Sequence, residues 1–595
     1  MLKPDRSELD YLELANRGKR LAPPSGPRLK VALLGDVSTQ HLVPLLRALF
    51  ASNGVDSEIY EAGFDTVEVE VLDPGSGLYA FGPDVIVLLQ SVAKLKASYY
   101  ESPGERAQFA RDHATRIEEV WKAIRARSGA PIVQSTFVLP YDRPFGNYGG
   151  AVADTLQGAV LELNREIGLR ARANPGVLLN DVDYIAAWVG RRHFIDEKLW
   201  ALSKSLCALD LLPEVAQNIV DVSLAAQGRT VKCVVLDLDN TLWGGVVGDD
   251  GLDGIELGER DETGAYRSFQ LYLRELGRRG VLLAVCSKND ESLARRVFRE
   301  HPGMVLREEH IAAFVANWED KATNIRRIRD KLNIGLDSMV FLDDNPFERN
   351  LVRQLVPEVV VPELPEDPGL YVRAVSELNL FETASHSALD ERRGALYQEQ
   401  ERREEERACF ASLDEYLRSL ETVARVARFE PRDLPRIAQL LQRSNQFNLT
   451  TRRHSEAECA AMMRAEGDCF PFSITVRDRF GSFGLVNVVI LRRAGGALEV
   501  DTFVMSCRVL QRGVEQLAMN KVFEQARRAG CGSVLGRYLP TAKNGMVKDF
   551  YPRFGFHAAA PPEAEGFAYR LEVDEYVPRQ VHIREVAAFE PGGGP

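Results

Sequence analysis

The chain has 595 residues, of which 45% are hydrophobic and 27% are charged, and both shares are ordinary for globular protein. At roughly 100–200 residues per domain, this length predicts several domains rather than one. The formal net charge of −12 argues against a nucleic-acid binder.

The sequence shows neither a signal-peptide pattern nor an apolar run of transmembrane length, so we expect a cytoplasmic protein with no membrane partner. Its eight cysteines have no CxxC or metal-ligand spacing, and several lie within apolar stretches. This usage is typical of reduced core residues in the cytosol.

Residues 1–28 are polar and predict an N-terminal arm, whereas residues 29–228 alternate between strand and helix patterns. Apolar strands are predicted at 30–35, 84–89 and 131–136, with a helix around 107–127. Alternating strands and helices predict a parallel sheet with helices on both faces. A further helix is predicted to open at 36–39 and to run through Phe50.

The first block resembles the SGNH-type esterases, or more broadly a flavodoxin-like sheet, because Gly35-Asp36-Val37-Ser38 follows its first strand. The usual GDS order is broken, and no carboxy-terminal Asp-x-x-His follows; His193 is a loose candidate for the base. Ser38 can equally be interpreted as a helix N-cap. We interpret the block as a degenerate relative with a binding or docking role.

The middle block, residues 229–375, begins with an apolar run that ends in two carboxylates and a hydroxyl, Asp237, Asp239 and Thr241. The run predicts a parallel strand buried on both faces, so the carboxylates lie at its carboxyl end, where open α/β sheets bind ligands. Clustered carboxylates at such a place are costly unless a cation or a reaction uses them.

Three more polar positions follow strands or open a helix in the same block. A strand at 281–287 ends in Ser287, whose hydroxyl is suited to a phosphoryl oxygen, and Lys321 opens a helical stretch and can neutralise phosphate charge. A third strand from 338 ends in Asp343 and Asp344. Carboxylates from two strand ends are hard oxygen ligands that suit Mg²⁺.

The DxDxT pattern resembles the first motif of the haloacid dehalogenase (HAD) phosphotransferases. The resemblance implies a Rossmann-like domain with little or no cap, since only about 50 residues separate Asp237 from Ser287. It implies that Asp237 is the nucleophile and Asp239 the general acid/base. The alternative interpretation of any one of these residues is structural, because a lone aspartate after a strand is usually a turn former or helix cap. The implied phosphate-binding residues are Thr241, Ser287 and Lys321, and the implied metal ligands are Asp237, Asp239, Asp343 and Asp344.

Residues 376–421 predict a helical connector with mixed charge, residues 422–580 a third domain, and residues 581–595 a tail. Strands at 484–491 and 497–505 meet at Gly495-Gly496, which predicts a hairpin. A basic, glycine-containing loop then leads into a helix through Arg528. This order resembles the α+β fold of GNAT acyltransferases, whose loop holds the pyrophosphate of coenzyme A. Glu515 replaces the usual second glycine, and its charge opposes a pyrophosphate.

Cys507 lies at the amino-terminal approach to this helix, beside Arg508 and Arg512. Taken alone, a cysteine is more often a small buried residue than a nucleophile. The position and the two cations are features that lower the pKa of a thiol, so Cys507 is a candidate catalytic nucleophile. The resemblance to GNAT proteins implies that Arg508, Arg512 and Gly513 bind a pantetheine arm.

Together, the HAD-like and GNAT-like blocks resemble the FkbH-like family, over residues of about 29 to 575. The resemblance implies transfer of a D-glyceryl unit from 1,3-bisphosphoglycerate to the phosphopantetheine thiol of an acyl carrier protein, with dephosphorylation, in polyketide and antibiotic biosynthesis. The implied cofactor is Mg²⁺. Two alternatives stay open: a Mg²⁺-dependent phosphatase of a small metabolite, and a GNAT N-acyltransferase. The supporting motifs are 239–246, 341–346, 444–450 and 506–515.

Overall fold

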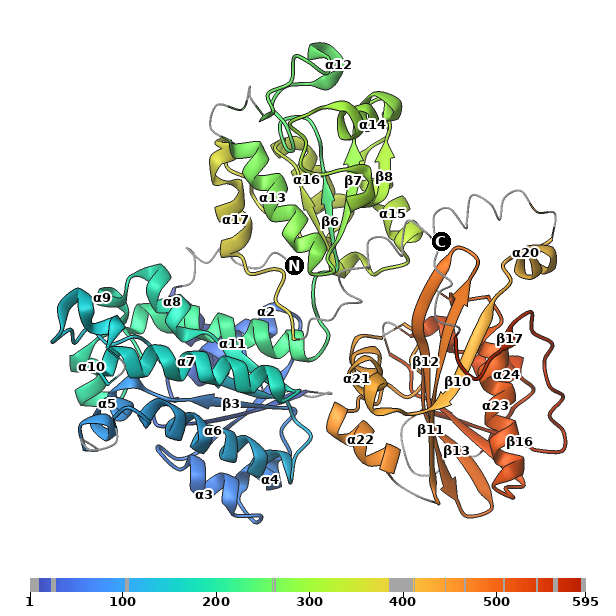
Figure 1. Cartoon of the computed structure of the whole chain (residues 1–595), viewed down its shortest axis with the longest axis horizontal. Coiled ribbons are helices and arrows are strands. Elements are labelled where there is room, and N and C mark those ends of the chain that lie inside the picture. The colour runs from blue at the N-terminus through green and yellow to red at the C-terminus, as the bar shows by residue number, and fades with distance from the viewer. Residues whose placement is uncertain are drawn as a thin grey trace. The chain divides into compact units, whose positions relative to one another are not determined.

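The computed structural model describes residues 10–22, 28–101, 106–152, 154–258, 261, 264–384, 410, 412–444, 446–464, 467–506, 509–541, 544–559 and 566–589. The chain divides into two units, Met1–Thr230 with Arg373–Ala384, and Val231–Val372 with Ser385–Pro595. Each unit is described by itself (Figure 1).

The first unit is built on one five-stranded parallel sheet with strand order β2-β1-β3-β4-β5. Its strands are β1 (Leu29–Gly35), β2 (Ser57–Glu61), β3 (Val85–Leu89), β4 (Ile132–Ser135) and β5 (Val177–Asn180). Its helices are α1 (Tyr11–Arg20), α2 (Leu42–Ser52), α3 (Val67–Leu72), α4 (Gly77–Phe81), α5 (Val92–Glu101), α6 (Phe109–Arg125), α7 (Leu156–Ala173), α8 (Val182–Val189), α9 (Arg191–Phe194), α10 (Glu197–Ser203) and α11 (Leu212–Ala226).

Helices cover both faces of this sheet, as the alternating pattern predicts. Val31 and Leu33 of β1 belong to a core with α1, α2, α8 and α11, whereas Ala32 and Leu34 belong to a core with α5, α6 and α7. In Figure 1, α11 and α6 lie on opposite sides of β3. Because successive side chains of a strand point to opposite faces of the sheet, β1 contributes residues to both cores.

The helix predicted to open at 36–39 begins later. α2 starts at Leu42, with His41 at its N-cap position, so the interpretation of Ser38 as a helix N-cap is wrong. The backbone N–H of Ser38 instead donates to the carbonyl oxygen of Lys204 at 2.9 Å. A contact with a segment far along the chain therefore fixes the backbone of this turn before the helix begins.

The middle part of the chain forms a four-stranded parallel sheet with order β8-β7-β6-β9. The strands are β6 (Cys233–Leu236), β7 (Leu282–Ser287), β8 (Ile311–Ala316) and β9 (Met339–Leu342). All of their residues are buried, so each reads as a continuous apolar run. The helices are α12 (Val247–Asp250), α13 (Ala265–Arg278), α14 (Glu291–Glu300), α15 (Lys321–Leu332) and α16 (Pro346–Leu355). The next helix, α17 (Tyr371–Glu377), begins in this unit and ends in the first.

The third part is a mostly antiparallel sheet of eight strands with order β15-β16-β14-β13-β12-β11-β10-β17. β13 and β14 pair in parallel, and α23 lies between them in sequence. The strands are β10 (Val423–Arg428), β11 (Cys469–Asp478), β12 (Gly481–Ala494), β13 (Ala497–Met505), β14 (Ser533–Tyr538), β15 (His557–Ala559), β16 (Phe567–Glu572) and β17 (Arg584–Glu585). The helices are α20 (Leu413–Ser419), α21 (Leu434–Arg443), α22 (Glu456–Arg464), α23 (Val514–Arg528) and α24 (Phe550–Arg553).

The predicted fold class is confirmed: two parallel α/β sheets are followed by an α+β sheet. The hairpin predicted at Gly495-Gly496 joins β12 to β13. Residues 385–409 of the predicted connector lie outside the described residues. None of the helices in the described ranges combines the length and apolar composition that crossing a membrane requires. Six of the described cysteines are buried.

Gln270 of α13 ties together two loops of the middle sheet and provides a test of this packing. The side chain is fully buried; its Nε2 donates to the carbonyl of Leu242 at 2.7 Å, and its Oε1 accepts from the amides of Val305 and Leu306 at 2.9 and 3.1 Å. Gln270→Leu would leave three buried backbone groups unpaired, at a cost of roughly 2–5 kcal/mol. We expect hydrogen-exchange mass spectrometry to show faster exchange of the Val305 and Leu306 amides.

The matched control is Gln354→Leu on α16, where the glutamine is exposed. This change should leave exchange at 305 and 306 as in the parent protein, with an effect on stability within about 0.5 kcal/mol. Unaltered exchange of these two amides in Gln270→Leu would contradict the assigned role of Gln270.

Candidate active site

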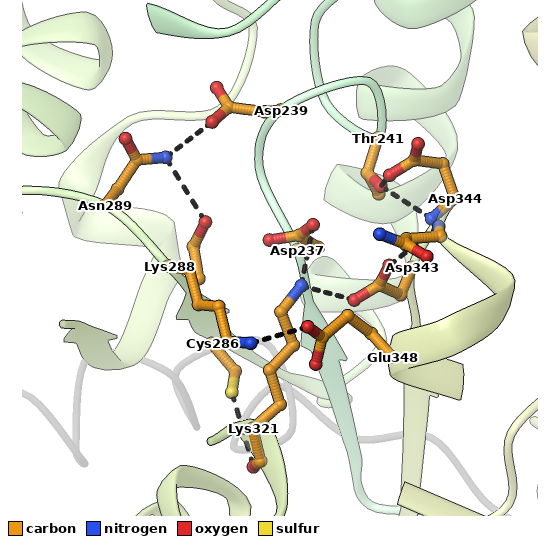
Figure 2. Close-up of polar contacts among 12 residues, drawn as sticks. Asp237, Asp239, Thr241, Cys286, Lys288, Asn289, Lys321, Asp343, Asp344 and Glu348 are labelled. Carbon is orange, nitrogen blue, oxygen red and sulfur yellow. Dashed lines mark hydrogen bonds and ion pairs between the residues drawn. The ribbon is translucent and has the colours of Figure 1, made fainter. Parts of the chain in front are cut away.

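The predicted polar residues of the middle sheet gather at the carboxyl ends of its strands. Strand pairing places Leu236 of β6 opposite Leu342 of β9, and the amide of Asp237 continues the ladder to the Leu342 carbonyl at 3.0 Å. This register places Asp237 beside Asp343 (Figure 2). Lys321 is the first residue of α15, because the Asp320 carboxylate caps that helix through the Thr323 amide at 2.8 Å.

Lys321 forms the centre of the cluster. Its side chain is only 3% exposed, and its Nζ lies 2.8 Å from Asp237 Oδ2 and also forms an ion pair with Asp343 Oδ2. Burial alone would lower the pKa of Lys321, but the two carboxylates raise it above its usual value. The ammonium therefore stays charged and fixes the orientation of both carboxylates.

Asp237, Asp343 and Asp344 each offer one oxygen, and these three atoms lie within 4.8 Å of one another. Burial, followed by repulsion from Asp237, raises the pKa of Asp343 to about 7 and also raises the pKa of Asp344. A bound cation would stabilise the charged form of these converging carboxylates. Three hard oxygens, with positions left for water and phosphate, fit the ligand preference of Mg²⁺.

Thr241 and Arg349 hold Asp344 in place. The fully buried Thr241 Oγ1 donates to Asp344 Oδ1 at 3.3 Å and accepts from the Asp344 amide at 3.1 Å. The Arg349 guanidinium donates to the carbonyls of Asp343 and Asp344 at 2.8 and 2.6 Å. In this arrangement the Thr241 hydroxyl orients a carboxylate, and its predicted contact with phosphate stays a prediction.

Asp239 lies apart from the three clustered carboxylates. One oxygen accepts from Trp243 Nε1 and the Val247 amide at 2.9 and 3.0 Å, and the other accepts from Asn289 Nδ2 at 2.7 Å. Burial raises the pKa of Asp239, and a raised carboxyl pKa suits a general acid. The structure thus brings together three of the four predicted metal ligands, and a ligand role for Asp239 stays a prediction.

Ser287 is buried at the end of β7 and accepts from Asn289 Nδ2 at 3.3 Å. Sequence reasoning missed Asn289, although it stands two residues after the predicted Ser287. It also missed Lys288 and Glu348, which form an ion pair at 2.6 Å. Lys288 and Asn289 could have been predicted from their positions, because polar residues next to a site at a strand end belong to the same loop.

In the third domain, Cys507 and Arg508 lie outside the described residues. Arg512 is 9% exposed and lies 3.5 Å from Asp478, so its predicted contact with a pantetheine arm stays a prediction. Gly513 has φ of 85°, which favours glycine, at the N-cap of α23. The Glu515 carboxylate accepts from the Gln511 amide at 3.0 Å, and burial raises its pKa.

In the part of the chain that the structure describes, the two residues predicted as a nucleophile and a base in the first domain, Ser38 and His193, are not joined by a hydrogen bond. His193 Nε2 instead lies 2.8 Å from the Asp210 carboxylate on the exposed surface. Asp36 is buried and accepts from the Ser91 amide at 2.6 Å, and burial raises its pKa to about 6.

Comparison with known proteins identifies the family. The model of the FkbH N-terminal domain matches residues 30–224. The N-terminal part of a Bacteroides fragilis protein, containing a phosphatase domain and solved in complex with Mg, is 40% identical, with a TM-score of 0.59. The match covers 63% of this chain and 99% of that one. The chain therefore belongs to the FkbH-like family.

Other solved structures match about a quarter of the chain with low scores. The ribosomal-protein-S18-alanine N-acetyltransferase of Escherichia coli is 15% identical over 25% of this chain and 94% of that one, with a TM-score of 0.20. The GNAT domain of S. lividans PAT is 16% identical over 25% of this chain and 89% of that one, with a TM-score of 0.21. No curated protein matches the chain.

The raised pKa of Asp343 predicts that Mg²⁺ affinity depends on pH. Below about pH 7 this carboxyl is protonated because of burial and Asp237, so the cation must displace a proton. We expect the dissociation constant to rise by up to about tenfold per pH unit below pH 7 and to level off above it. Isothermal titration calorimetry of the full chain with MgCl₂ in two buffers of different ionisation heat measures both affinity and proton release.

Asp343→Asn is the matched variant: its affinity should be weaker, and its proton release on binding should fall. Mg²⁺ affinity that stays constant between about pH 5.5 and pH 8.5 in the parent protein would contradict the assignment of Asp343 as a ligand of raised pKa.

Proposed function

We propose that this protein transfers a D-glyceryl unit from 1,3-bisphosphoglycerate to the phosphopantetheine thiol of an acyl carrier protein and removes phosphate, in polyketide-type biosynthesis. The observation that carries the proposal is the buried Lys321 between Asp237 and Asp343, at the carboxyl end of a parallel sheet. Membership of the FkbH-like family supports it, as does the phosphatase domain named in the Bacteroides fragilis structure.

The phosphatase half of the reaction uses the chain's own groups. An Asp237 oxygen attacks phosphorus, and the ester P–O bond breaks as Asp239 gives a proton to the leaving oxygen. Asp239 then takes a proton from the water that cleaves the aspartyl-phosphate. Lys321 orients Asp237 and offsets phosphoryl charge. The Ser287 hydroxyl, which accepts from Asn289, would donate to a phosphoryl oxygen.

The Asp237, Asp343 and Asp344 carboxylates would hold Mg²⁺, since their oxygens converge and are of the type that this ion prefers. Bound there, Mg²⁺ would neutralise charge on the phosphoryl group. The Thr241 hydroxyl orients the Asp344 carboxylate, and Arg349 holds the backbone carbonyls of Asp343 and Asp344.

The acyl-transfer half needs a thiol. An acyl phosphate is already activated, so a Cys507 thiolate can attack the carbonyl carbon, expel the acyl phosphate, and form a thioester with the glyceryl unit. The ester phosphate of that unit is removed separately at the Asp237 site, before or after this step. The carrier thiol then attacks this thioester and regenerates the Cys507 thiolate. A carrier protein also accounts for Glu515, because this carboxylate lies in the first turn of α23 and takes the Gln511 amide, where a pyrophosphate of coenzyme A would otherwise bind.

A plain phosphatase of a small phosphorylated metabolite is the second candidate. This candidate is favoured because the described residues of the Asp237 cluster could hydrolyse a phosphate ester without any thiol. A GNAT N-acyltransferase has less support, because that activity would leave the Asp237–Lys321–Asp343 cluster without a use.

The test is intact-protein mass spectrometry of a holo acyl carrier protein incubated with the full-length protein, Mg²⁺ and 1,3-bisphosphoglycerate. The proposal predicts a mass gain that matches a glyceryl group. Cys507→Ala should abolish loading, because no acyl-enzyme forms, and should leave release of the ester phosphate at the Asp237 site intact. Cys531→Ala, which alters a buried free cysteine of the same domain, should load the carrier normally.

A phosphoglyceryl gain would place phosphate removal after acyl transfer, and Asp237→Asn should accumulate this species in that case. Glyceryl loading at the parent rate by Cys507→Ala would contradict the covalent role of Cys507. An unmodified carrier, with phosphate still released, would contradict the transfer proposal and favour the plain phosphatase.

A further inference from the structure

A second lysine borders the Asp237 cluster and has no role in the reaction described above. Lys288 directly follows Ser287 at the end of β7, and its Nζ donates to Glu348 Oε1 at 2.6 Å. Figure 2 shows this ion pair beside Lys321 and Asp343. The Lys288 side chain is 37% exposed, whereas that of Glu348 is 8% exposed.

Glu348 is positioned by the start of α16. Asn345 caps this helix through the Phe347 amide at 2.9 Å, and Pro346 is its first residue. Glu348 therefore lies in the first turn of the helix, four residues after Asp344. In the described part of the chain, Glu348 Oε2 has no hydrogen-bond partner. A buried carboxylate with one satisfied oxygen is costly, and the ion pair with Lys288 offsets that cost.

The two lysines differ in what remains available to a substrate. Lys321 is buried, and Asp237 and Asp343 use two of its three N–H donors, so at most one donor is left for a ligand. Lys288 has three N–H donors, and Glu348 accepts one of them. Because more than a third of its side chain is exposed, the other donors can reach a group that enters from solvent.

We infer that Lys288, held in place by Glu348, binds a second anionic group of the substrate, which rests on the proposed phosphatase function of the Asp237 site. The phosphoryl group occupies the Ser287–Asn289 side of the loop, and a carboxylate or second phosphate of the same molecule meets Lys288. The site then selects phosphate monoesters with two anionic groups over those with one. Lys288 is a specificity-determining residue, and Glu348 is a positioning residue.

Two probes isolate this contact: glycerate 3-phosphate and glycerol 3-phosphate, which differ at the terminal carbon in a carboxylate against a hydroxymethyl group. Phosphate release by the full-length protein with Mg²⁺ gives kcat and KM for each. In the parent protein we expect a lower KM for glycerate 3-phosphate. Lys288→Met should raise this KM about tenfold, as expected for one charge-assisted hydrogen bond, with kcat little changed.

The same variant should alter the KM for glycerol 3-phosphate by less than about twofold, since no second anion is present. Lys288→Arg should retain most of the preference. Glu348→Gln should also weaken the preference for glycerate 3-phosphate, as Lys288→Met does, because the Lys288 ammonium loses its ion pair. Arg278→Met is the charge-matched control. Arg278 is 69% exposed at the end of α13, which leads into the amino end of β7, whereas Lys288 follows the carboxyl end of that strand.

Binding to Asp237→Asn, measured by calorimetry with and without Lys288→Met, tests the contact without turnover. Equal affinity for the two probes, or an equal loss for both in the double variant, would overturn the inference. Phosphate release from neither probe would count against the proposed phosphatase function, and the calorimetry would still decide the role of Lys288. Phosphate release with no discrimination would overturn the inference alone.

Discussion

The ion pair of Lys321 with Asp237 and Asp343 is the interaction on which the candidate site depends. Two carboxylates buried at adjacent strand ends repel each other, and the buried ammonium between them makes the arrangement stable. The sheet register brings the carboxylates together, and the cap of α15 presents the lysine to both. Removing either partner would leave an uncompensated buried charge, so the fold and the chemistry of this domain share one constraint.

Much of this site could be predicted from the sequence because parallel strands end at the same edge of a sheet. Asp237, Ser287 and Asp343 each follow an apolar run, and order along the chain was enough to place them together. Lys321 was predictable as the opening residue of a helix. The alternating pattern of the first domain likewise predicted a parallel sheet with helices on both faces, which the two cores around β1 confirm.

Contacts between side chains far apart in sequence could not be predicted in this way. Lys288 and Glu348 are 60 residues apart, and their pairing depends on side-chain conformations that periodicity does not encode. The Thr241 hydroxyl contacts Asp344, 103 residues away. Ser38 had a favourable residue type for an N-cap, but its amide binds the Lys204 carbonyl, so a tertiary contact overrode the local preference.

The central claim is that Asp237 is the nucleophile of a phosphatase site. The full-length protein, quenched in acid during turnover of glycerate 3-phosphate with Mg²⁺ and treated with borohydride, tests it most directly, because reduction converts an aspartyl-phosphate to homoserine. Peptide mass spectrometry should find homoserine at position 237, and Asp237→Asn should yield none. Phosphate release without homoserine at 237, or with homoserine at another aspartate, would contradict the account.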